Sequence, residues 1–318
     1  MRICALFCAL AVSAQNLTIR TSVPLILVPT SVTDRHGKVI DGLNENDFDV
    51  LDNGKPVRHR LEIGASQRPI ALVVAVQTNT ISGPVLAKVQ KIGSMFEPLV
   101  AGDRGLVALL TYSHKITLVQ PFTGDGKLFS AKMRHLEPDG GAAKLNDAVV
   151  EAVKLMEDRG NYRRVLIIIG ESKDRGSSAK VEEAITKAQA SNVTIYPVSY
   201  SAYATPFTSK GDERFASGQR VYDSGAGLNL LSIFAEIGRL GAQNAAAEFS
   251  KYTGGARLSF TKLSGLEKVI AKVGDDLHTQ YLLSFSPTES TGPTYHEITV
   301  KVKKSEALIR ARPGYWSE

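Results

Sequence analysis

Residues 71–82, ALVVAVQTNTIS, carry the clearest pattern of apolar and polar positions in the chain. Six apolar residues run from Ala71 to Val76, and polar residues then follow, interrupted only by Ile81. A short apolar run that ends in a polar turn predicts a strand buried on both faces. Open α/β sheets bind ligands at the carboxyl ends of their strands, so we expect any site to include this turn.

Strand-like and helix-like patterns alternate from residue 67 to residue 280. Further buried strands are expected at 106–112, 165–169 and 193–198. Apolar residues at helical spacing predict helices over 85–96, 149–156, 181–188 and 266–277, the last preceded by a capping box of Ser264 and Glu267. This alternation predicts βαβ crossovers and a doubly wound, mainly parallel sheet that is covered on both faces.

Residues 15–66 and 281–318 differ from this region, because apolar and polar residues alternate there over short runs. Turn signals, such as Asp-Asn-Gly at 52–54, separate the runs. Each segment alone is too small to bury a core. We expect the two segments to pack together as a small β-sandwich-like module, with the α/β domain of residues 67–280 inserted between them.

Residues 200–228 are rich in Ser, Gly, Ala, Thr and Tyr and show no period. They predict a long loop. One interpretation is a surface insertion without a role in binding, and the other is a recognition loop beside the site.

Residues 1–14 have the features of a signal peptide: one arginine, an apolar stretch over 3–12 and a small-residue cleavage site at 12–14. We expect export to the periplasm or the outside of the cell; the competing interpretations are a buried first strand and a wrongly assigned start of the chain. The apolar stretch is too short to span a bilayer, so no transmembrane segment is expected in the mature chain. Both cysteines, Cys4 and Cys8, lie in this segment, so cleavage would leave no thiol.

Composition and charge narrow the possible functions. The chain has 318 residues, of which 43% are hydrophobic and 22% charged, as in ordinary globular proteins. Its net charge of +6 is spread along the chain, and no basic stripe with interleaved aromatic residues appears. We therefore expect no nucleic-acid binding.

Several stretches, taken together, resemble a known family. They are VTDRHGKVIDGLNENDFDVLDNGKPV at 32–57, the strand at 71–76, DRGLVALLTYS at 103–113, GGAAKLNDAV at 140–149, RVLIIIGESKDRGS at 164–177, QYLLSFSP at 280–287 and the terminal ARPGYW. The middle region resembles a von Willebrand factor A (VWFA) domain. The chain after the signal peptide is similar to the VWFA-related proteins abundant in Acidobacteria.

The resemblance implies a metal-ion-dependent adhesion site (MIDAS). In the family, an Asp-x-Ser-x-Ser turn, a Thr and a further Asp hold Mg²⁺ or Mn²⁺, and an acidic group of the partner completes the coordination. This chain departs from that pattern at every ligand position, where it carries Gln77, Asn79, Ile81, Ala143 and Glu171. Only one carboxylate remains, and Mg²⁺ demands near-ideal oxygen coordination. We expect a degenerate site without a metal or other cofactor; the alternative is a cation-dependent adhesion module that uses the reduced ligand set.

The polar residues around the same edge of the sheet suggest a second possibility. They could form a rim that recognises a protein partner by direct hydrogen bonds, or they could be solvated loops left after a site was lost. The residues of this candidate rim are Gln77, Thr78, Asn79, Ser82, Lys144, Asn146, Glu171 and Asp174. Asn146 is also expected to be the N-cap of the helix that follows.

Catalytic motifs are absent from the sequence. There is no G-x-S-x-G elbow, and the six histidines, read as surface or turn residues, show no zinc spacing. Glu171 and Asp174 are too close in sequence to face each other across a sugar, as a glycan hydrolase would require. We expect a non-enzymatic interaction or adhesion module with an unknown protein partner. An unrecognised envelope hydrolase and a purely structural envelope protein are the alternatives.

Overall fold

The computed structural model describes residues 25–62, 68–79, 82–98, 105–200, 230–260, 265–287, 294–304 and 306–317. Some expectations fall outside these ranges. They are the signal peptide at 1–14, nearly all of the loop at 200–228, the cap at Ser264 and the position of Ile81.

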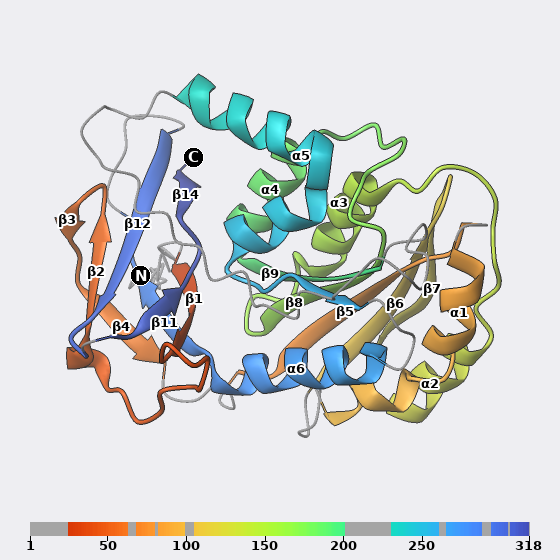
Figure 1. Ribbon diagram of the computed structural model, residues 1–318, viewed down its shortest axis with the longest axis horizontal. Helices are drawn as coiled ribbons and strands as arrows, with labels where there is room; N and C mark the ends of the chain where they lie inside the picture. The colour runs from red at the N-terminus through yellow and green to blue at the C-terminus, as the bar shows by residue number, and fades with distance from the viewer. Residues whose placement is uncertain are drawn as a thin grey trace, which may run out of the picture.

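A six-stranded sheet forms the centre of the molecule, in the order β10-β9-β8-β5-β6-β7 (Figure 1). Its strands are β5 (Ile70–Gln77), β6 (Leu106–Tyr112), β7 (Ile116–Thr123), β8 (Arg163–Gly170), β9 (Val193–Tyr200) and β10 (Leu258–Phe260). All are parallel except β7, which runs antiparallel to β6 at one edge. Every residue of β5 is buried, as its unbroken apolar run predicts. The expected doubly wound, mainly parallel α/β sheet is therefore confirmed.

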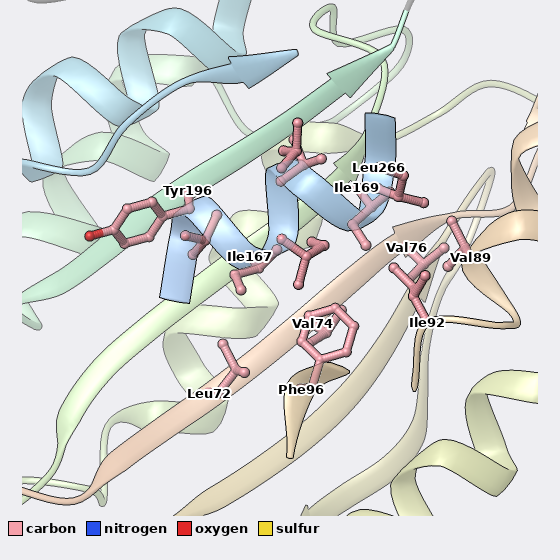
Figure 2. Packing of buried hydrophobic residues seen from close by; sticks show 14 of the residues in the cluster. Leu72, Val74, Val76, Val89, Ile92, Phe96, Ile167, Ile169, Tyr196 and Leu266 are labelled. Atoms are coloured by element: carbon pink, nitrogen blue, oxygen red, sulfur yellow. The ribbon is translucent and has the colours of Figure 1, made fainter. Parts of the chain in front are cut away.

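Helices cover both faces of this sheet (Figure 1). One face packs against α1 (Gly83–Val89), the 3-10 helix η3 (Gly93–Phe96), α2 (Gly126–Arg134) and α6 (Gly265–Thr279). The other packs against α3 (Leu145–Met156), α4 (Val181–Ala190) and α5 (Leu230–Thr253). Figure 2 shows the first face, where Val74 of β5 lies beside Phe96 and Val76 lies beside Ile92.

The first and last strands of the chain build a separate β module (Figure 1). One sheet has the order β13-β1-β11-β4 and the other β14-β12-β2-β3. The strands are β1 (Ile26–Thr33), β2 (Phe48–Asp52), β3 (Lys55–Pro56), β4 (His59–Glu62), β11 (Tyr281–Phe285), β12 (Thr294–Val302), β13 (Leu308–Arg310) and β14 (Gly314–Ser317); a 3-10 helix, η1 (Glu45–Asp47), precedes β2. Strand β1 pairs with β11 and β13, and β2 pairs with β12, so strands from the two ends of the chain share one core.

A buried polar cluster joins the β module to the α/β domain. Asp276 of α6 accepts hydrogen bonds from Ser31 of β1 at 2.9 Å and from the Tyr196 hydroxyl of β9 at 2.8 Å. The guanidinium of Arg310 in β13 forms an ion pair with the same carboxylate. Because Asp276 is 9% exposed, these partners hold its charge in a nearly dry environment.

The structure differs from the sequence-based expectations in several places. The helix predicted over 85–96 is two pieces, α1 and η3. Helices α2 and α5 and the edge strands β7 and β10 were not anticipated. Asn146 is not the N-cap: α3 begins at Leu145, so Asn146 lies in its first turn, where its side-chain nitrogen donates to the carbonyl of Ala179 at 3.1 Å. None of the described helices combines the length and the apolar character needed to cross a membrane.

Candidate functional site

Loops from several elements meet at the carboxyl end of β5. We call this region the crest, and define it as residues 78–79, 113–115, 139–144 and 171–177. The backbone of Thr78 ties two of its loops together, since its N–H donates to the Tyr112 carbonyl at 3.0 Å and its carbonyl accepts from the Asp139 N–H at 2.5 Å. The Ser82 hydroxyl donates to the Asn79 carbonyl at 2.5 Å. The turn after β5 is thus closed by its own hydrogen bonds.

Gln77 links this turn to the end of β8. The N–H of Glu171 donates to the side-chain oxygen Oε1 of Gln77 at 2.7 Å. A backbone N–H can only donate, so it fixes which way the amide faces. The amide nitrogen Nε2 therefore points the other way, and it donates to Asn79 Oδ1 at 2.9 Å and to Glu171 Oε2 at 3.3 Å. The NH₂ group of Gln77 therefore lies between Asn79 Oδ1 and Glu171 Oε2, two oxygens that could otherwise bind the same cation.

The charge of Glu171 is balanced from within the chain. Arg175 donates through Nε to Glu171 Oε2 at 3.3 Å and through Nη2 to Oε1 at 3.4 Å. The backbone N–H of Arg175 also donates to the carbonyl of Ala143 at 3.0 Å, which anchors this loop to the segment before α3. The Glu171 side chain is 8% exposed, whereas that of Arg175 is 39% exposed. The carboxylate is thus held below the surface and the guanidinium lies above it.

Asp174 organises the start of α3. Its two oxygens accept from the N–H groups of Asn146, Gly176 and Ser177 and from the Ser177 hydroxyl, at 2.5 to 3.3 Å. Ser177 in turn accepts from the N–H of Asp147 at 3.0 Å. These contacts satisfy amide groups of the first turn of α3, which the helix leaves without intrahelical partners. Asp174 therefore acts as a capping residue supplied by a distant loop.

A tightly packed tyrosine lies beneath the crest. The Tyr112 hydroxyl is fully buried and has no hydrogen-bond partner among the described residues, and burial raises the pKa of this phenol well above its usual value. A Cβ atom added at Gly170 would collide with that hydroxyl and would lie 2.7 Å from Gln77 Oε1. Gly170 is therefore the residue that lets β8 pass close to both side chains.

The structure places the residues of the candidate rim in two groups. Gln77, Asn79 and Glu171 contact one another, with Thr78 and Ser82 beside them, whereas Asp174 contacts Asn146 on the α3 side. All are buried except the half-buried Lys144 and Asp174. Arg175 was not recognised from the sequence, because a loop has no periodicity to show that a residue four positions later returns to Glu171.

The donor set at the crest does not fit a divalent cation. Mg²⁺ prefers several oxygen ligands, and a site in a protein rarely relies on one carboxylate. Here the NH₂ group of Gln77 faces the converging oxygens, Arg175 already neutralises Glu171, and Ala143 offers no side-chain oxygen. Within the described ranges, no group of three or more His, Cys, Asp or Glu side chains is arranged to hold a metal ion.

A buried polar cluster and a cavity lie away from the crest. The ring nitrogen Nδ1 of His296 is 2.8 Å from Asp52 Oδ1, and the Tyr315 hydroxyl donates to Asp52 Oδ2 at 2.9 Å, inside the core of the β module. The expectation that every histidine is a surface or turn residue is therefore wrong for His296, which is 5% exposed. A cavity of about 550 Å³ lies between the 41–46 loop, β4 and the C-terminal end of α6.

Several solved structures resemble this fold, whereas no curated protein matches the chain. An aerotolerance-related membrane protein from Bacteroides fragilis is 13% identical, with 65% of this chain and 98% of that chain covered and a TM-score of 0.44. BatB from Bacteroides thetaiotaomicron is 14% identical, with 65% and 99% covered and a TM-score of 0.42. The VWA domain of SpRpn10 is 13% identical, with 64% and 95% covered and a TM-score of 0.40.

The family model of the von Willebrand factor type A domain matches residues 85–217. The match begins in α1 and includes the crest segments 113–115, 139–144 and 171–177. Residues 85–217 of this chain are therefore similar to a von Willebrand factor type A domain.

Proposed function

We propose that this protein is an exported, non-enzymatic protein-binding module that works without a divalent cation. VWA domains are common protein-interaction and adhesion modules. The observation that carries the proposal is the Gln77 amide, whose NH₂ group donates to both Asn79 and Glu171. Hydrogen bonds within the chain thus take the place of metal coordination at a degenerate MIDAS.

The partner would bind at the crest, where the loops that follow β6 and β8 and the segment before α3 reach the surface. The buried residues Gln77, Asn79 and Glu171 would hold these loops in place, and the exposed side chains above them would contact the partner. Export is supported by the signal-peptide features of residues 1–14 and by the position of both cysteines inside that segment. The motif order also supports a relationship with the VWFA-related proteins of Acidobacteria.

Thermal unfolding with and without divalent cations tests metal independence. We expect the melting temperature of the wild-type chain to be the same in MgCl₂, in MnCl₂ and in EDTA. A ligand at 100 times its Kd would stabilise the folded state by about 2.7 kcal/mol, which is readily seen. A higher melting temperature of the wild-type chain with Mg²⁺ or Mn²⁺ would show that the reduced ligand set suffices and would reject the proposal.

A restored site provides the positive control. The changes Gln77→Asp, Asn79→Ser, Ile81→Ser, Ala143→Thr and Glu171→Asp rebuild the family's ligand set, and Arg175→Ala removes the competing guanidinium. This variant should gain cation-dependent stability that the wild-type chain lacks. Its far-ultraviolet circular dichroism in EDTA shows whether it folds without the ion.

A further inference from the structure

The cavity between the 41–46 loop, β4 and the C-terminal end of α6 has the size of a small-molecule site. Figure 1 shows this end of α6 beside the strands of the β module. The cavity volume of about 550 Å³ lies within the range of about 300–1,000 Å³ that is typical of ligand pockets. None of the described residues that line the cavity belongs to the crest, so a ligand here does not depend on the site proposed above.

The wall of the cavity is negatively charged. The described residues that line it include the carboxylates of Asp41, Glu45 and Glu62, and none of them is a lysine or an arginine. Glu62 is neutralised by Arg68, whose Nε atom lies 2.6 Å from Oε2. Glu45 accepts one side-chain hydrogen bond, from the N–H of Leu61 at 3.1 Å, and Asp41 has no hydrogen bond or ion pair with a described residue. Two carboxylates therefore lack a cationic partner within the part of the chain that the structure describes.

The C-terminal end of α6 adds to this negative charge. The helix is 15 residues long, and the carbonyl groups of its last turn carry a partial charge of about −0.5. Burial raises the pKa of the nearby Tyr281 phenol above its ordinary value, and the negative charges of Asp41 and Asp47 raise it further. The carboxylates and the helix end together favour a cation over an anion.

The rest of the wall is apolar and is held in place by hydrogen bonds. Leu43, Leu61 and Tyr281 line it. The Tyr281 hydroxyl donates to the Ile40 carbonyl at 2.8 Å and accepts from the N–H of Leu43 at 3.1 Å, which ties the 41–46 loop to β11. The capping box of η1 fixes the end of the same loop. A wall that is already formed loses little conformational entropy when a ligand binds.

A divalent metal ion does not fit this cavity. Mg²⁺ and Ca²⁺ require several converging oxygen ligands. Among the described residues, no group of three or more His, Cys, Asp or Glu side chains is arranged to hold an ion, and Glu62 is already paired with Arg68. The volume and the apolar part of the wall suit a larger cation with a hydrocarbon chain.

We infer that this cavity binds an organic cation that carries an alkyl chain, either a free alkylamine or a lysine side chain of another protein. The ammonium group pairs with Asp41 and Glu45, and the alkyl chain contacts Leu43, Leu61 and Tyr281. Such ligands combine a charged head with an apolar stem, as the two parts of the wall require. Because Asp41 and Glu45 are exposed, each carboxylate alone contributes modestly to the affinity.

Saturation-transfer NMR titrations with hexylamine test this inference on the full chain. We expect hexylamine to bind several-fold more tightly than 1-hexanol and hexanoate, which share its chain but not its charge. Asp41→Asn and Glu45→Gln should each weaken hexylamine binding by about two- to threefold, and the double variant by about five- to tenfold. Glutamine retains an oxygen for the Leu61 N–H, so the loop should keep its structure. Asp49→Asn, which removes an exposed acid of β2 outside the cavity wall, should bind like the wild-type chain.

N-acetyl-lysine methylamide distinguishes the two sources of the cation. Tighter binding than that of hexylamine assigns the cavity to a lysine side chain of another protein, and equal or weaker binding assigns it to a free amine; both support the inference. Absence of hexylamine binding, equal binding of 1-hexanol, or an unchanged affinity of the double variant would reject it. Displacement of hexylamine by millimolar CaCl₂ at constant ionic strength would reject it in favour of a metal site. These results leave the metal independence of the crest to its own test.

Discussion

The side-chain oxygen of Gln77 accepts a 2.7 Å hydrogen bond from the backbone N–H of Glu171, a residue 94 positions later in the chain. This bond joins the carboxyl ends of the neighbouring strands β5 and β8. It also turns the amide nitrogen of Gln77 toward Asn79 and the Glu171 carboxylate. One side chain therefore closes the crest from below, and its removal should affect stability more than an ordinary surface substitution.

Gln77→Met should destabilise the fold by about 2–3 kcal/mol. Methionine has a similar length but leaves the buried N–H of Glu171 without its acceptor and Asn79 Oδ1 without its donor, and such groups carry their full desolvation cost. Glu171 Oε2 also loses one donor but keeps Arg175. Urea unfolding measures the change. Gln90→Met is the matched control, because Gln90 makes one side-chain hydrogen bond, to the Leu136 carbonyl, at a half-buried position. Similar losses in the two variants would show that the Gln77 network adds little.

Gly170→Ala should be destabilising because of the Tyr112 hydroxyl. The new methyl group collides with that hydroxyl, and overpacking of this kind costs about 1–3 kcal/mol. Tyr112→Phe alone should be neutral or stabilising, since it removes a buried hydroxyl that has no partner among the described residues.

The double variant Gly170→Ala/Tyr112→Phe distinguishes this clash from a general effect of the added methyl group. It should recover part of the lost stability, while the contact with Gln77 prevents full recovery. Unfolding free energies for the complete cycle measure the coupling between the two positions. If the changes in unfolding free energy of the two single variants simply add in the double variant, the clash with the Tyr112 hydroxyl does not cause the loss of stability.

Asp276→Asn should weaken the junction between the β module and the α/β domain. The change removes the negative charge that partners Arg310, and breaking one side of a buried ion pair typically costs about 3–5 kcal/mol. Asp275→Asn is the control, because Asp275 is the exposed neighbour on the same helix. Denaturant unfolding followed by tyrosine fluorescence should show a large shift for Asp276→Asn only. Equal shifts would place the effect in the helix itself and not in the junction.

Glu248→Gln should stabilise the protein at neutral pH. Burial raises the pKa of Glu248 above its ordinary value of 4.5, since its Oε2 atom is buried without a partner among the described residues. A raised pKa in the folded state means that the neutral form is favoured there, so stability is greatest below the unfolded pKa and falls as the pH rises through the folded pKa. The advantage of the Glu248→Gln variant over the wild-type chain should therefore be present at neutral pH and vanish in acid.

The control for this pH dependence is Glu183→Gln, on the exposed face of α4. It should change stability little at either pH. Melting temperatures measured from acid to neutral pH test both variants. If Glu248→Gln is no more stable than the wild-type chain at neutral pH, the carboxylate is stabilised in the folded state by contacts that offset its burial.

The strands of the central sheet were predictable because their burial on both faces leaves an unbroken apolar run, as in β5 and β8. The helices were less predictable where local backbone geometry, and not the spacing of apolar residues, determines the type of helix. The apolar positions from Val85 to Phe96 fit one helical face, yet the chain changes there from an α-helix to a 3-10 turn. The antiparallel strand β7 was missed because, at the edge of the sheet, only one of its eight residues is fully buried.

The candidate site was predicted in position but not in detail. The polar turn after Val76 showed where the loops would meet. No sequence pattern indicated that Gln77 would reach Glu171, or that Arg175 would cover the same carboxylate, because these contacts depend on how three loops fold over one another. His296 was assigned wrongly for a similar reason: its partners Asp52 and Tyr315 come from strands far apart in the chain.

The pairing of β1 with β11 and β13 has a consequence for the order in which the protein is made. Strand β1 is synthesised long before β11 and β13. It therefore stays unpaired while the inserted α/β domain folds around its own core. Completion of the β module therefore depends on the last residues of the chain. A ribosome that stops before β11 would release a folded crest attached to a first strand with an open edge, the kind of product that associates with other chains and is removed by proteases.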